Sequence, residues 1–137
     1  MKNLRSILAA LAVLLMATAA HAQPRTVSAT VPFNFVVGDR SYPAGEYLFR
    51  NSGAVLMITN AEQTKTDITF SNACEAATPS ANTKLVFDSM GGYYFLRQIW
   101  IEGYSSGRAL ARSRTEVQLA QNHEKQGSVI VAANISR

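Results

Sequence analysis

Apolar side chains recur at every second position through the segment that follows residue 25. They are Val27, Ala29, Val31, Phe33, Phe35 and Val37, with Ser28, Thr30 and Asn34 between them. A period of two is typical of a strand with one buried face. Pro32 has no backbone N–H to donate, so it indicates an edge position or a bulge. Residues 26–37 are therefore predicted to form a half-buried strand, which commits the chain to a β-sheet fold.

Six further β-prone runs follow, and turn-forming residues separate them. They cover residues 46–50, 54–59, 67–74, 84–88, 93–101 and 128–133. Asn51-Ser52-Gly53 predicts one hairpin turn, and Gly91 with Gly92 supplies the positive φ that a second tight hairpin requires. About seven short antiparallel strands predict a mostly β domain, either a single β-sandwich or a partly closed β-barrel.

One short C-terminal helix is expected beside these strands. Ser113-Arg114-Thr115-Glu116 fits a capping box, in which the serine caps the first turn and the glutamate reaches back. The helix is predicted to end near Asn122 and His123. The run 93–101 is apolar on both faces, with one set on each side: Tyr93, Phe95, Ile99 and Ile101 against Tyr94, Leu96 and Trp100. We expect the helix to cover the outward-facing set.

The first 22 residues have the pattern of an export signal. A basic start at Lys2 and Arg5 precedes an apolar run over 6–20, and Ala20-His21-Ala22 offers a cleavage site. The run is short for a membrane-spanning helix, so a retained anchor is the weaker alternative. We expect a cleaved signal peptide at 1–22 and one β-rich domain at 23–137. That domain would lie in the periplasm or cell envelope, or outside the cell.

The charge that remains after cleavage does not favour a nucleic-acid partner. The full chain has a formal net charge of +4, and loss of Lys2 and Arg5 lowers it to +2. Nucleic-acid-binding domains usually carry a clustered basic stripe on a strongly basic fold. No second apolar run approaches spanning length, so no transmembrane span is expected after cleavage.

The residues that usually carry catalysis are scarce. Cys74 is the only cysteine, and His123 is the only histidine after the leader. The predicted strand places Cys74 on one face with Ile68 and Phe70, which favours a buried thiol; a reactive or inter-chain thiol is the alternative. Cys74 with His123 lacks a cysteine-protease signature. Two such residues cannot close a zinc site either. We expect no catalytic residue, metal or cofactor, although paired carboxylates for sugar hydrolysis stay open.

Two sets of residues are candidates for binding. Arg108, Arg112 and Arg114 lie within seven residues, at the positive end of the predicted helix, and could contact an anion or a partner. The alternative is a solvated connector whose arginines meet Glu102 or Glu116. Tyr94 and Trp100 would form an aromatic platform if they face outward. Otherwise they belong to the core.

Several motifs together resemble a family of small exported proteins that is frequent in Acidobacteria. The opening V-P-F-x-F-x-x-G…P-A-G-x-Y spans residues 31–47, and further matches are KLVF at 84–87, YFLRQIW at 94–100 and SGR at 106–108. Ala109 and Ala111 stand where relatives carry an acidic residue and a proline. The resemblance implies a Gram-negative-type envelope location and one compact domain. It transfers no catalytic residue, because the family has no established activity.

These observations predict an exported, non-catalytic periplasmic or envelope protein that binds a protein partner or a surface polymer. The alternative is a small β-barrel carrier of an apolar small molecule. Its cavity would be lined by Phe35, Phe95 and Ile99. The sequence leaves the oligomeric state open.

Overall fold

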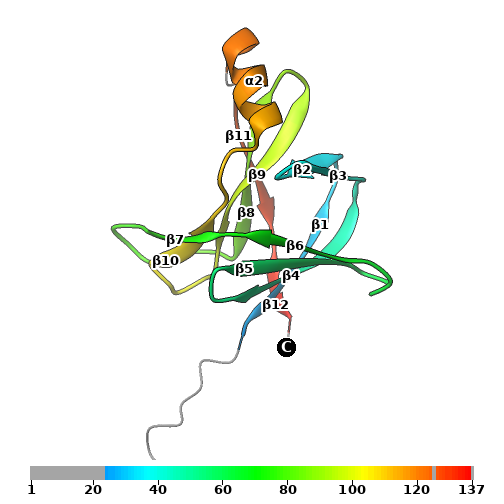
Figure 1. Ribbon diagram of the computed structural model, residues 1–137. Helices are drawn as coiled ribbons and strands as arrows, with labels where there is room; N and C mark the ends of the chain where they lie inside the picture. The colour runs from blue at the N-terminus through cyan, green and yellow to red at the C-terminus, as the bar shows by residue number, and fades with distance from the viewer. Residues whose placement is uncertain (1–23, 125, 137) are drawn as a thin grey trace, which may run out of the picture.

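Two facing β-sheets and one short helix make up the computed structural model, which describes residues 24–124 and 126–136 (Figure 1). The first sheet has the order β12(Asn134–Ser136), β1(Thr26–Val31), β4(Gly45–Ser52), β5(Val55–Asn60), β6(Thr66–Phe70). The second sheet has the order β11(Gly127–Ala132), β8(Lys84–Met90), β9(Tyr93–Trp100), β10(Ser106–Ala109), β7(Asn72–Glu75). A small hairpin, β2(Phe35–Val37) and β3(Arg40–Tyr42), joins the second sheet through a parallel pairing of β2 with β9.

The predicted β class is confirmed, and the two sheets form an open sandwich rather than a closed barrel. In Figure 1, β4, β5 and β6 run across the direction of β8 and β9. This arrangement resembles orthogonal packing, in which strands turn corners and continue in the other sheet. The predicted leader at 1–22 lies outside the described residues.

The chain passes from one sheet to the other four times, once through the turn between β3 and β4 and otherwise at three corners. The first lies between β1 and β2, where Pro32 interrupts the ladder. The second is Ser71, between β6 and β7, whose backbone N–H donates to the carbonyl of Ala54 at 2.9 Å. The third is Ala133, between β11 and β12, whose N–H donates to the carbonyl of Thr83 at 3.0 Å.

These corners correct two of the predicted strands. Residues 26–37 and 67–74 are not single strands, because each divides into two strands that belong to different sheets. The described residues form twelve strands instead of about seven. Besides the two divided segments, the additional strands are β3, β10 and β12.

The hairpin β8–β9 forms as predicted but contains a β-bulge. Gly91 and Gly92 occupy its turn with φ of 57° and 80°. The register pairs Val86 with Gln98 but Phe87 with Leu96, so Arg97 is the extra residue on β9. A bulge shifts the alternation of side chains, and the predicted faces of β9 are therefore wrong beyond this point.

The corrected faces follow from the strand pairing. Leu96 pairs with Phe87 and Ile99 with Leu85, and the two partners lie two residues apart on β8. Leu96 and Ile99 thus share the inner face of the second sheet. By the same pairing, Phe95 opposite Asp88 and Trp100 opposite Lys84 share the outer face.

The helix α2(Arg114–Asn122) begins at Ser113, as predicted. The Ser113 Oγ accepts from the backbone N–H of Glu116 at 3.1 Å. The carboxylate of Glu116 does not close the predicted box, since it accepts from the Arg97 guanidinium of β9 instead. The helix thus lies near the β8–β9 turn (Figure 1). Thr115 and Leu119 line a small pocket together with Phe95 of the outer face of the second sheet.

Candidate binding cleft

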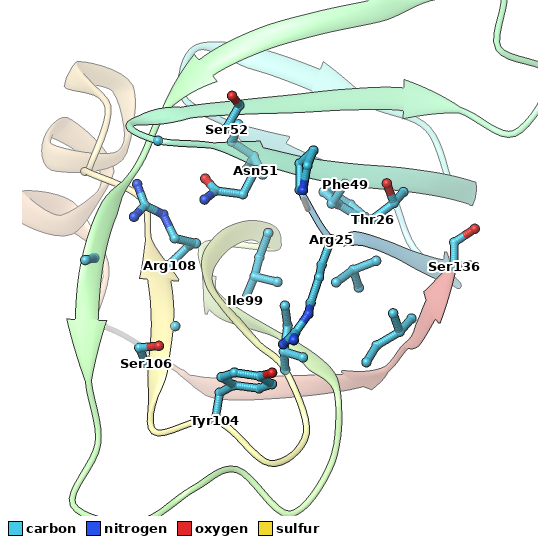
Figure 2. A pocket seen from close by; sticks show the side chains of 18 residues that line it. Arg25, Thr26, Phe49, Asn51, Ser52, Ile99, Tyr104, Ser106, Arg108 and Ser136 are labelled. Carbon is cyan, nitrogen blue, oxygen red and sulfur yellow. The ribbon is translucent and has the colours of Figure 1, made fainter. Parts of the chain in front are cut away.

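The space between the two sheets is filled at one end and hollow at the other. The filled end holds four aromatic rings, Phe35, Tyr42, Tyr47 and Phe87, in stacked or edge-to-face contact with centroids 5.2–5.8 Å apart. At the opposite end lies an open cleft of about 1090 Å³ (Figure 2). Ligand sites typically have volumes of about 300–1,000 Å³, so the cleft is large enough for a small molecule.

The floor of the cleft is apolar because inner-face residues of both sheets line it. Val27, Phe49, Leu56 and Ile99 belong to the core and are only 1–4% exposed, whereas Ile101 and Ile135 are more exposed. Alternation along each strand directs these side chains inward. The predicted carrier cavity lined by Phe35, Phe95 and Ile99 is wrong in two of its three residues. Phe35 is buried in the filled end, and Phe95 faces outward beneath α2.

Polar groups surround this floor, and two of them are arginines. Arg108 lies on β10 opposite Ile99, on the inner face of the second sheet. Its Nε donates to the Ser71 Oγ at 3.1 Å, and its Nη2 donates to the Ser71 carbonyl at 2.5 Å. Ser71 is buried and also donates to the Oδ1 of Asn51 at 3.4 Å. These bonds hold the Arg108 guanidinium beside Asn51 (Figure 2).

Arg25 lies across the mouth of the cleft from Arg108. Its guanidinium carbon lies 4.0 Å from the centre of the Tyr104 ring, which is a cation–π contact (Figure 2). Arg25 and Tyr104 are both exposed to solvent. No aspartate or glutamate lines the cleft, so the formal charges along its described lining are all positive.

The three predicted arginines do not form one site. Arg108 lines the cleft, whereas Arg112 and Arg114 lie at the start of α2. The Nε of Arg112 lies 3.8 Å from the Oε1 of Glu116. Glu116 was one of the two acidic partners expected if these arginines belonged to a solvated connector. Arg114 is exposed at the first position of the helix.

A buried group of charges lies under the same helix. Arg97 donates to the Oδ2 of Asp88 at 3.2 Å, to the carbonyl of Leu110 at 2.7 Å and to Glu116. The Asp88 and Glu116 side chains are 5% and 3% exposed. Burial lowers the pKa of Arg97, and Asp88 opposes that shift. This group fixes the helix to the sheet and does not face the cleft.

Tyr94 and Trp100 do not form the aromatic platform considered from the sequence. Tyr94 stacks on Phe33 with centroids 4.1 Å apart. Trp100 is 9% exposed and its ring lies against Gly107, where a Cβ would come within 2.7 Å of the Cε3 atom. Its Nε1 donates to the Oε1 of Gln98 at 3.0 Å. Both rings are packed within the fold, which was the alternative expectation.

Cys74 is half-buried, and its predicted apolar neighbours face solvent. Ile68 and Phe70 are 62% and 79% exposed on the outer face of β6, while Cys74 belongs to β7 in the other sheet. The corner at Ser71 breaks the predicted face. Burial raises the pKa of the Cys74 thiol, although the nearby Arg108 opposes this.

His123 lies far along the chain from that thiol, in different surroundings. It caps the C-terminal end of α2 through its N–H bond to the Leu119 carbonyl, and its ring lies beside Gly91. Among residues 24–124 and 126–136, no three His, Cys, Asp or Glu side chains gather in a way that could hold a metal ion.

Most of the cleft had no signal in the sequence. Arg108, as a contact residue, and Ile99, as a cavity residue, were predicted and line the cleft, whereas Asn51 and Ser71 were assigned to a turn and to a strand. Only their meeting at the corner between the sheets makes them neighbours.

Comparisons with known proteins add no identification: no family model, curated protein or solved structure matches this chain. Within the described ranges, no helix has the length and apolar character needed to cross a membrane.

Proposed function

We propose that this protein is an exported, non-catalytic binding protein that takes a small apolar or amphipathic ligand into the cleft between its sheets. The observation that carries this proposal is the cleft of about 1090 Å³ with an apolar floor, in a sandwich whose other end is packed with aromatic rings. Burial of apolar ligand surface against such a floor supplies binding free energy of roughly 25 cal/mol per Å² before the costs of association.

Export is supported by the pattern of residues 1–22. A periplasmic or envelope location and the resemblance to the exported family are parts of the same proposal. The sequence also predicted a polymer or protein partner that contacts Arg108, Arg112 and Arg114. That partner stays a prediction and is separate from the cleft proposal, because Arg112 and Arg114 do not line the cleft.

The test is binding of Nile red, a neutral apolar dye whose fluorescence rises in apolar surroundings. Ile101→Asp places a charge in the cleft, and Ile68→Asp makes the same change on the exposed outer face of β6. We expect Ile101→Asp to weaken dye binding at least about tenfold and Ile68→Asp to leave it unchanged. Circular dichroism would verify that both variants fold.

Two results would overturn the proposal. One is failure of the wild-type protein to bind the dye at all. The other is equal binding by both folded variants, which would place the dye elsewhere on the surface. Native mass spectrometry of the protein from its host's envelope would then identify a retained natural ligand by its added mass.

A further inference from the structure

We infer that the ligand of the cleft is an amphipathic anion, with its carboxylate or phosphate headgroup bound by Arg108 and Asn51 and its apolar body on the floor of the cleft. This inference rests on the proposed function and names the class of ligand.

Arg108 carries a charge that the described part of the protein does not neutralise. It is half-buried, its partner Ser71 is neutral, and no acidic side chain within residues 24–124 or 126–136 forms an ion pair with it. A partly desolvated cation is costly unless an anion compensates it. By contrast, Arg97, which is also half-buried, contacts both Asp88 and Glu116. Arg108 therefore has the environment of a ligand-binding cation.

The geometry of Arg108 also suits an anionic headgroup. A guanidinium has five N–H donors in a rigid fork, and Ser71 takes the Nε donor and one donor of Nη2. Nη1 and the second donor of Nη2 remain for an anion. Asn51 accepts from Ser71 through Oδ1, which leaves its Nδ2 donors beside the same guanidinium. Bonds from charged donors to carboxylate or phosphate oxygens are about twice as strong as neutral ones.

The apolar body would follow from the same position. Ile99 pairs with Arg108 across the strands but is only 4% exposed. An alkyl chain attached to an anion at Arg108 would instead lie against Ile101 and Ile135, the more exposed apolar side chains of the same cleft. Arg25 at the mouth adds positive potential, but it is exposed and screened by solvent.

The experiment compares probes that share one alkyl chain and differ in the headgroup: dodecanoate, dodecyl phosphate, dodecanol and dodecylamine, each displacing Nile red at neutral pH. We expect the two anions to bind at least about tenfold more tightly than dodecanol, and the amine more weakly than dodecanol. Their relative affinities distinguish a carboxylate from a phosphate headgroup. Acetate and inorganic phosphate, which lack the chain, should not displace the dye at the same concentrations.

The variants test whether Arg108 carries this preference. Arg108→Gln should reduce the preference for dodecanoate over dodecanol to about twofold or less, with dodecanol affinity retained as evidence of an intact cleft. Asn51→Asp keeps Arg108 but places a carboxylate beside it, and should abolish the preference by occupying the site. Arg25→Gln, the matched control at the mouth, should change it less than about threefold.

The inference fails if dodecanol binds wild-type protein as tightly as dodecanoate, or if folded Arg108→Gln and Asn51→Asp keep the preference. The proposed function would survive either result, because dodecanol and Nile red would still bind. Failure of every chain-bearing probe to bind the wild-type protein would overturn both.

Discussion

The two ends of the sandwich share strand β4, yet one end is filled with aromatic rings and the other is open. At the filled end, the β2–β3 hairpin inserts Phe35 and Tyr42 between the sheets, where they meet Tyr47 and Phe87. At the open end, the inner faces of β1, β4, β5 and β9 continue without such a hairpin, and the cleft lies between them. We therefore expect loss of a ring at the filled end to destabilise the fold more than loss of a half-buried side chain at the open end, where the proposed ligand would bind.

Truncation of a ring at the filled end tests this division most directly. Phe35 is 1% exposed, and Phe35→Ala should lower the free energy of unfolding by about 3–5 kcal/mol through lost burial and the cavity left behind. Ile101 at the open end is half-buried, and Ile101→Ala should lower the free energy of unfolding by about 1 kcal/mol. Urea unfolding measures both values. Equal losses would mean that the open end stabilises the fold as much as the filled one.

The charges beneath α2 extend the comparison to the outer face. Arg97→Met would remove a cation that contacts two buried carboxylates, Asp88 and Glu116, and should lower the free energy of unfolding by about 3–5 kcal/mol. Arg112→Met is the control, because the Arg112 side chain is 51% exposed and lies 3.8 Å from the same Glu116 oxygen. Its loss should cost less than about 1 kcal/mol. A similar destabilisation by both variants in thermal melts would contradict the assignment of Arg97 as the principal partner.

The open end contains one tightly packed position. A Cβ at Gly107 would lie 2.7 Å from the Trp100 Cε3 and 2.8 Å from the Ile99 carbonyl oxygen. Gly107→Ala should therefore destabilise the protein by about 1–3 kcal/mol, while the change Ser106→Ala at the exposed neighbour has little effect. A shift in Trp100 fluorescence should accompany the first change. An unaltered melting temperature for Gly107→Ala would show that β10 and β9 separate easily.

Alkaline pH should act first on the filled end. Burial, with a hydrogen bond to Asp67, raises the pKa of Tyr42 well above its ordinary value of 10.0, and burial also raises the pKa of Tyr47. Above pH 10 the unfolded chain loses these protons before the folded one. The stability that they contribute is present below pH 10 and declines as pH rises further. Tyr42→Phe should make the decline of melting temperature shallower; an unchanged slope would contradict the role of Tyr42.

The sequence predicted most of the longer elements, but it missed β3, β10 and β12 and did not predict how the elements assemble. Alternation predicted the strands, Gly91-Gly92 the hairpin and Ser113 the start of the helix. Alternation could not reveal the corners, because the period of two continues when the chain leaves one sheet and enters the other.

Alternation also identifies residues that share a face without saying which face is inward. Ile68 and Phe70 point to solvent, whereas Asp67 of the same strand points inward, where Arg40 and Tyr42 bind it. The cleft depends on the spacing between the sheets, which no local pattern encodes. Arg108 was identified as a contact residue from its charge, but its partners Ser71 and Asn51 became neighbours only through the fold.

The corner at Ser71 has a consequence for the order in which the molecule acquires its properties. Asn51 belongs to the first sheet, Arg108 to the second, and Ser71 bonds to both at the junction. An assembly intermediate with only one sheet formed would hold one of these groups without the other. The anion site proposed above would thus require both sheets to be docked around Ser71, so it tests tertiary assembly rather than the formation of either sheet.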